Sequence, residues 1–157
     1  MRRASIVQVN VNPAGGVPKR PVASARLTAE GVVGDRQLDL EHHGGPRRAV
    51  CLFSRERIDA LAAEGHPIAP GTTGENLTLE GVDWAALTPG ARLRVGDALL
   101  EITSPAPPCS TIAASFTDGA FKRISEKLHP SWSRLYAKVL VEGEVRPGDP
   151  VVLEPRA

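Results

Sequence analysis

Glycine and proline interrupt this chain so often that long regular elements are excluded over most of its length. Its 157 residues include 15 glycines and 14 prolines. Glycine permits turn conformations and proline disrupts helices and central strands, so short elements joined by turns are favoured. Between these positions apolar and polar residues alternate, as in residues 4–11 and 135–141, which is the pattern of half-buried strands. The sequence therefore predicts a mainly β protein of about seven to nine short strands.

Individual elements follow from local pattern. Residues 48–53 form a continuous apolar run, which predicts a strand buried on both faces. Ser54 is suited to cap a helix that ends near Gly65. Residues 92–103 read as two strands around a Gly-Asp turn, and residues 118–128 place Phe121, Ile124 and Leu128 on one face of a second helix.

The order of these elements predicts the architecture. Strands separated by turns, with only two or three short helices, favour a mixed or antiparallel β-barrel over a doubly wound sheet. No linker or shift in composition divides the chain, so we predict a single domain over residues 1–157.

Composition and charge exclude several classes of function. The chain carries 19 basic and 18 acidic residues and 4% aromatics, which predicts no nucleic-acid surface. No stretch has the apolar length of a signal peptide or membrane span, so we expect a cytoplasmic protein with no membrane partner. Two cysteines and four histidines without metal-ligand spacing argue against a structural zinc site. No nucleophile elbow, Walker loop or dinucleotide fingerprint is present.

Cys109 is the most informative candidate residue. Pro105, Pro107 and Pro108 stiffen the backbone before it, and residues 110–114 are able to open a helical turn after it. Unpaired amides at a helix start stabilise a thiolate, the form that ligates soft metals, carries sulfur or attacks electrophiles. The alternative is a small buried hydrophobe. That second reading is favoured for Cys51, which stands among apolar neighbours.

A second candidate segment spans residues 31–48. Paired glycines can turn successive amides inward as an anion-binding nest, and nearby arginines would hold a phosphate. The alternative is an ordinary turn with solvated arginines. The residues concerned are Asp35, His43, Gly44, Gly45, Arg47 and Arg48.

A third candidate is the phrase Gly74-Glu75-Asn76 just before a predicted strand. Its carboxylate and amide are groups that hydrogen-bond a heterocycle or orient a histidine. An Asn-ended turn that leads into the strand is an equally good reading.

Taken in order, these segments resemble the MOSC family, named for the C-terminal domain of molybdenum cofactor sulfurases. The resemblance covers about residues 26–153 and is to short stand-alone bacterial members. The matching phrases are Gly34-Asp35, His43-Gly44-Gly45 with Ala49-Val50, Gly74-Glu75-Asn76-Leu77, Leu93 to Asp97, Pro108-Cys109, Tyr136 to Leu140 and Gly148-Asp149.

The resemblance implies a MOSC-type, pyruvate-kinase-like β-barrel that binds a molybdenum cofactor (molybdopterin). It implies that Cys109 ligates the metal or carries sulfur and that His43 and Glu75 act beside it in catalysis. Asp35, Gly44, Gly45, Arg47, Arg48, Gly74 and Asn76 would bind the cofactor. Pyridoxal phosphate binding is a further association of the family as a whole. Many relatives have an arginine shortly before the Pro-Cys pair, where this chain has Ala106.

Three functions remain open from the sequence. The first is reduction of an N-hydroxylated small molecule at a molybdenum cofactor, with electrons from a partner protein. The second is metal-free chemistry of the Cys109 thiolate, either persulfide transfer from a sulfur-donor protein or carbon–sulfur bond cleavage. The third is a non-catalytic module that binds a cofactor or an anion. The sequence does not indicate an oligomeric state.

Overall fold

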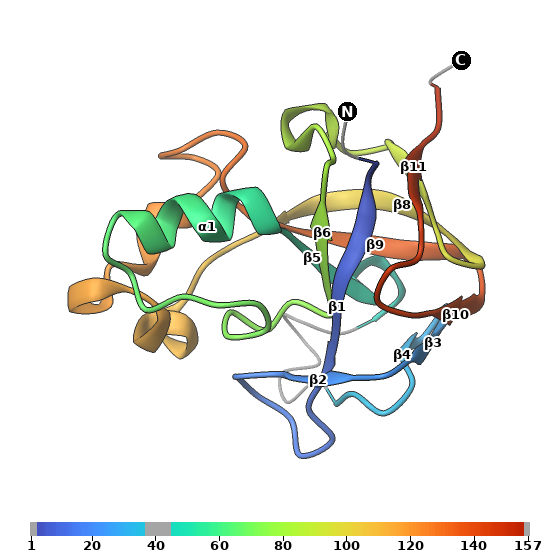
Figure 1. The fold of residues 1–157 in the computed structure, drawn as a ribbon, viewed down its shortest axis with the longest axis horizontal. Helices are drawn as coiled ribbons and strands as arrows, with labels where there is room; N and C mark the ends of the chain where they lie inside the picture. Colours follow the sequence, from blue (N-terminus) through green and yellow to red (C-terminus); the bar gives the residue numbers. More distant parts are fainter. Residues whose placement is uncertain (1–2, 37–44, 156–157) are drawn as a thin grey trace.

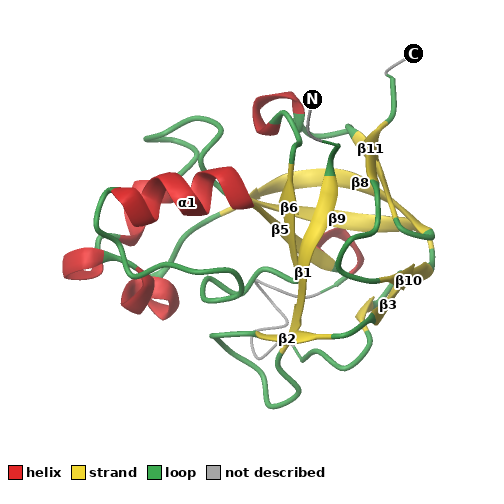
Figure 2. Ribbon diagram, viewed as in Figure 1, coloured by secondary structure: helices red, strands yellow, loops and turns green. Residues whose placement is uncertain are grey.

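The structure is a computed structural model and describes residues 3–36 and 45–155. A curled sheet dominates it, with α1 and a group of short 3₁₀ turns gathered at one side (Figures 1 and 2). The strands are β1 (Ser5–Val11), β2 (Arg20–Val22), β3 (Ala25–Thr28), β4 (Gly31–Val32), β5 (Val50–Ser54), β6 (Leu77–Glu80), β7 (Arg92–Val95), β8 (Ala98–Ala106), β9 (Arg134–Val141), β10 (Gly143–Val145) and β11 (Val151–Leu153). The helices are α1 (Arg55–Ala63) and 3₁₀ turns at Pro46–Arg48, Trp84–Ala86, Ser110–Ser115, Thr117–Gly119 and Phe121–Ile124.

The strands form one large and one small sheet. The large sheet has eight strands in the order β11-β7-β8-β9-β5-β6-β1-β2, and β10-β3-β4 form the second sheet. Every pairing is antiparallel except that of β5 with β6. The predicted mainly β, mixed architecture is confirmed, with more and shorter strands than the sequence suggested.

The large sheet curls until its two ends almost meet. An isolated bridge joins Ser5 to Pro150, next to β11. The Ile6 amide donates to the Asp149 carbonyl at 2.9 Å, and the Gly148 amide donates to the Ile6 carbonyl at 2.7 Å. Because these bonds do not continue as a ladder, the sheet forms a nearly closed barrel and not a complete one.

The centre of the sheet follows the sequence pattern closely. All five residues of β5 are buried, as its apolar run predicts. Ser54 then caps α1, with its hydroxyl accepting from the Arg57 amide at 3.1 Å, and α1 ends just before Gly65. The buried face of this helix presents Ile58 and Leu61 to the core. Both the strand and the helix are confirmed.

The predicted hairpin is also confirmed, in β7 and β8. Its turn contains Gly96, with φ of 53°, a conformation that favours glycine. A Cβ at this position would lie 2.9 Å from the Glu144 carbonyl oxygen, so the turn packs closely against β10.

The helix predicted over residues 118–128 is wrong. In its place are two short 3₁₀ turns, Thr117–Gly119 and Phe121–Ile124, separated by Ala120, whose backbone is not helical. Asp118 has φ of 57°, which no regular right-handed helix accommodates. Ile124 is buried as expected, whereas Leu128 is 59% exposed.

The buried apolar residues form a main core and a small separate cluster. The main core includes Val50 and Leu52 of β5, which point to one side. A small separate cluster contains Cys51, Ala106 and Tyr136, which point to the other. In the parts of the chain that the structure describes, no helix has the length and apolar character needed to cross a membrane.

Candidate functional site

The face that carries the small cluster is the floor of a pocket of about 570 Å³. Cys51 on β5 pairs with Tyr136 on β9, and Ala106 on β8 pairs with Arg134 on β9. Arg134 and Tyr136 are two residues apart on one strand, so their side chains share a face. The pocket floor is therefore built across three neighbouring strands that lie far apart in sequence.

Cys109 lies in the wall of this pocket. It follows β8 and Pro107-Pro108, and it precedes the 3₁₀ turn Ser110–Ser115. The predicted helical turn after the cysteine is thus confirmed. The thiol is free and partly exposed, and its Sγ lies 2.8 Å from Oγ1 of Thr111. Its chemical role stays a prediction.

Four cationic side chains line the same pocket. They are Lys19, Arg36, Arg48 and Arg134, and no aspartate or glutamate is among the described lining residues. The Arg48 guanidinium carbon lies 5.4 Å from the Tyr136 ring centroid, a cation–π distance. Lys19 forms an ion pair with Asp35, in which both side chains are buried.

Arg134 is a site residue that sequence reasoning missed. It is 6% exposed. Its Nη1 donates to the Thr73 carbonyl at 2.7 Å and its Nη2 to the Pro107 carbonyl at 3.2 Å. Its buried Nε has no hydrogen-bond partner among the described residues. A guanidinium therefore stands directly across the ladder from Ala106, and only strand register reveals it.

Asp35 and Asn76 lie behind the pocket wall, outside its lining. Asp35 accepts from Asn76 Nδ2 and from the Asn12 amide, each at 2.8 Å, as well as from Lys19. The Oδ1 of Asn76 accepts from the Cys51 amide at 3.0 Å. These polar groups tie the loop around Lys19 to β5, and any direct contact of theirs with a cofactor stays a prediction.

Glu75 is fully buried beneath the wall and is likewise absent from the pocket lining. Burial raises the pKa of its carboxyl, while hydrogen bonds from Gly71, Thr73 and Thr78 act in the opposite direction. Its predicted role in catalysis remains untested. Gly74 does line the pocket, and a Cβ there would lie 2.7 Å from Val17 Cγ1.

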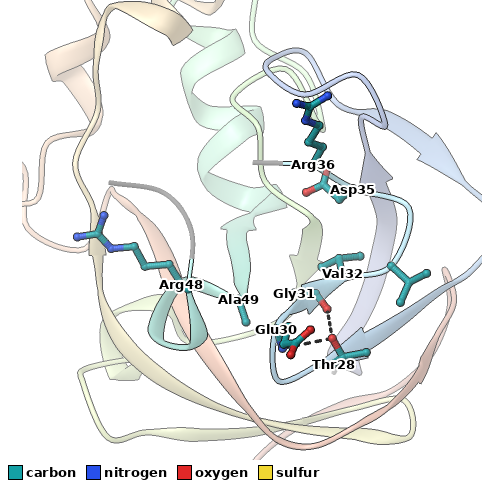
Figure 3. Close-up of a pocket in the computed structure, with 10 residues that line it drawn as sticks. Thr28, Glu30, Gly31, Val32, Asp35, Arg36, Arg48 and Ala49 are labelled. Atoms are coloured by element: carbon teal, nitrogen blue, oxygen red, sulfur yellow. Dashed lines mark hydrogen bonds between the residues drawn. The ribbon is translucent and has the colours of Figure 1, made fainter. Parts of the chain in front are cut away.

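The arginines at the pocket edge also face a second hollow of about 370 Å³, drawn in Figure 3. Arg36 and Arg48 line both, whereas Gly45 and Asp35 line only the second. Arg47 is exposed, and its carbonyl accepts from the Thr103 hydroxyl. The two other residues of the predicted nest, His43 and Gly44, lie outside the described residues.

The position of Cys51 differs in one respect from what the sequence predicted. Its predicted burial is confirmed at 4% exposure, yet it also lines the pocket that contains Cys109. Burial raises the pKa of the Cys51 thiol to about 11, with Arg134 opposing this shift. Cys51 therefore stays protonated at neutral pH.

These residues suit an anionic group that carries a soft metal or sulfur centre. A single thiol, unlike a carboxylate or imidazole set, selects soft ions, and the surrounding cations attract phosphate. No group of three histidine, cysteine, aspartate or glutamate residues suited to a bare metal ion occurs in residues 3–36 and 45–155. The pocket volume is within the usual range for small-molecule sites, and the unpartnered Arg134 Nε fits an anionic ligand.

Comparisons with known proteins agree with this fold. The model of the MOSC domain family matches residues 39–152. The uncharacterized protein YflK of Bacillus subtilis is 33% identical over 135 residues, which cover 85% of this chain and 60% of YflK. Protein YiiM of Escherichia coli is 36% identical over 88 residues, which cover 53% of this chain and 39% of YiiM. The chain thus spans less than two thirds of the length of either relative.

A solved structure extends the likeness to nearly the whole chain. The crystal structure of YiiM from Geobacillus stearothermophilus superposes with a TM-score of 0.74 at 27% sequence identity. The alignment covers 98% of this chain and 76% of that one.

Proposed function

The chain belongs to the MOSC family, and from this premise we propose that its pocket binds a phosphate-bearing molybdenum–pterin cofactor, with the Cys109 thiolate as the protein ligand to the metal. A soft thiolate is a suitable donor to such a metal. The observation that carries the proposal is that Cys109 and four cationic side chains face one pocket.

The charge of the pocket matches one phosphate group. Asp35 balances Lys19 by direct contact. Thr73 joins the buried Glu75 carboxyl to Arg134, with its hydroxyl donating to Glu75 and its carbonyl accepting from the guanidinium. Arg36 and Arg48 add two positive charges to the described pocket lining, and a phosphate monoester carries about −1.5 to −2 at pH 7.

The proposed reaction is reduction of an N-hydroxylated small molecule. The balanced change is R–NHOH plus two electrons and two protons to R–NH₂ and water, with electrons supplied by an electron-transfer protein. The bound cofactor supplies the two-electron chemistry. Within this chain, Arg36 and Arg48 would hold the phosphate and Cys109 would hold the metal, while Tyr136 and Cys51 line the pocket floor. His43 lies outside the described residues, and its catalytic role stays a prediction.

Cofactor content gives the direct test. The wild type, Cys109→Ala and Arg48→Ala are expressed in a host that makes molybdenum cofactor, and molybdenum and pterin are measured in each purified protein. Arg94→Ala is the control, because Arg94 is exposed and pairs with Glu154 away from the pocket. We expect equal molybdenum and pterin in the wild type and control, loss of metal in Cys109→Ala, and reduced pterin in Arg48→Ala. Absence of both from folded wild type contradicts the proposal.

Turnover is tested on the loaded protein with a reduced viologen dye as electron donor and an N-hydroxylated amidine as substrate. We expect amidine formation that requires Cys109. Tight cofactor binding without turnover of any N-hydroxylated compound would instead support a non-catalytic binding module.

A metal-free sulfur carrier is the second candidate, favoured by the free, partly exposed Cys109 thiol. In that reaction a donor persulfide passes its outer sulfur to the Cys109 thiolate, and the donor leaves as a thiolate. Mass spectrometry after incubation with a cysteine desulfurase and cysteine should then show an additional sulfur on Cys109 and none on Cys51. Failure with several donors contradicts this candidate.

A further inference from the structure

A buried chain of contacts connects Glu75 to the Cys109 segment. The Glu75 carboxylate accepts from the Thr73 hydroxyl at 2.9 Å, the Thr78 hydroxyl at 2.9 Å and the Gly71 amide at 3.0 Å. All three donors belong to the segment that enters and begins β6. The carboxylate therefore fixes the conformation of this turn, including the direction of the Thr73 carbonyl.

Arg134 continues the chain from that carbonyl to the cysteine loop. One guanidinium nitrogen donates to the Thr73 carbonyl, and another donates to the carbonyl of Pro107, two residues before Cys109. Planar guanidinium geometry fixes two acceptors at once, which a lysine ammonium on a flexible stem does less well. The position of Pro107, and with it the approach to Cys109, depends on where Thr73 holds Arg134.

The three residues of this chain of contacts are all buried. Glu75 and Thr73 are 0% exposed and Arg134 is 6% exposed, so water does not substitute easily for any of the three. Arg134 forms no ion pair with a described carboxylate, and Thr73 joins it to the buried Glu75 carboxyl. Removal of either end of this chain leaves buried polar groups of Thr73 or its neighbours without a hydrogen-bond partner.

We infer that Glu75, Thr73 and Arg134 form a positioning chain that holds the Cys109 loop in place, so that Glu75 acts on the thiol through Arg134. Glu75 is then a positioning residue and not a group that touches the substrate. The inference deepens the proposed function, on which only its catalytic consequence rests. The structural consequence applies to the protein with or without cofactor.

The two threonines that donate to Glu75 offer a matched pair of variants. Thr73→Val removes the hydroxyl on the path toward Arg134, whereas Thr78→Val removes a hydroxyl that donates to the other carboxyl oxygen and also accepts from Asn10 Nδ2 at 3.3 Å. Both residues are 0% exposed and both bonds measure 2.9 Å. Thr78→Val should therefore cost at least as much global stability as Thr73→Val, while only Thr73→Val should disturb the Cys109 loop.

The first measurement is amide hydrogen exchange of the cofactor-free protein, together with the rate at which iodoacetamide alkylates Cys109, mapped by peptide mass. Thr73→Val and Arg134→Lys should each accelerate exchange at the amides of residues 109–112 and change the alkylation rate by roughly two- to tenfold, the equilibrium effect of one net hydrogen bond. Thr78→Val should leave both quantities within about 1.5-fold of wild type.

Arg57→Lys is the control for the loss of an arginine. Arg57 also binds a backbone carbonyl, that of Ser131, but it lies on α1 and stacks over Trp132. We expect no change at the amides of residues 109–112 in this variant. If Thr73→Val and Thr78→Val disturb the Cys109 loop equally, in proportion to their loss of stability, the positioning chain is refuted.

In loaded protein, Thr73→Val should lower kcat more than it changes KM, since misplacement of the thiol leaves substrate contacts intact. If the wild type binds no cofactor, the proposed function fails while the exchange and alkylation results still decide the positioning chain. The two failures are thus distinguishable.

Discussion

The buried thiol of Cys51 makes a quantitative prediction for stability at alkaline pH. In the folded protein burial raises its pKa from an ordinary value of 9.0 to about 11. Between these values the unfolded chain loses the proton while the folded chain keeps it. The stabilisation is therefore fully present below pH 9 and is lost as the pH rises toward 11.

The magnitude follows from the two pKa values. Their difference corresponds to about 3 kcal/mol in total, of which about 1.4 kcal/mol is lost at pH 10 and almost none at pH 8. Other groups also titrate in this range, so the informative quantity is the stability difference between wild type and Cys51→Ala. We expect that difference to shrink by about 1.4 kcal/mol between pH 8 and pH 10.

The assay is urea unfolding under reducing conditions at pH 8, 9 and 10. Val50→Ala is the matched control, because Val50 is its buried neighbour on β5 and carries no titratable group. Its stability difference from wild type should be the same at each pH. A difference for Cys51→Ala that is also constant across the series would refute the assignment of a raised pKa to this thiol.

Three further outcomes are expected. Cys109→Ala should leave the free energy of unfolding within about 0.5 kcal/mol of wild type, because the Cys109 side chain is partly exposed. A larger loss in urea unfolding would show that Cys109 has a structural role. Lys19→Met should cost about 3 kcal/mol of unfolding free energy, because it leaves the buried carboxylate of Asp35 without its ion-pair partner. In a double-mutant cycle, adding Asp35→Leu should recover part of that loss, and purely additive effects would contradict the pairing. Ser54→Ala should cost about 1 kcal/mol by removing the hydroxyl that accepts from the Arg57 amide, and thermal unfolding unchanged from wild type would count against the cap.

The local sequence pattern correctly predicted those elements whose buried residues recur at a regular spacing. The apolar run that became β5, the Ser54 cap of α1 and the hairpin of β7 and β8 were all predicted correctly. Each depends on side-chain periodicity and turn chemistry within about a dozen residues. The prediction failed at residues 118–128, where non-helical backbone at Ala120 and extended backbone at Ser125 limit the helical part to Phe121–Ile124, although the apolar spacing favours a longer helix.

The sequence by itself determined the mainly β class, the family and the prominence of Cys109, because turn residues and ordered motifs are local properties. Only the tertiary structure placed Arg134 across from Ala106, Cys51 in the same pocket as Cys109, and Glu75 behind the wall. Strand register and sheet curvature decide these positions. A period of two specifies that alternate residues share a face, but it does not specify which strand lies alongside or what that face encloses.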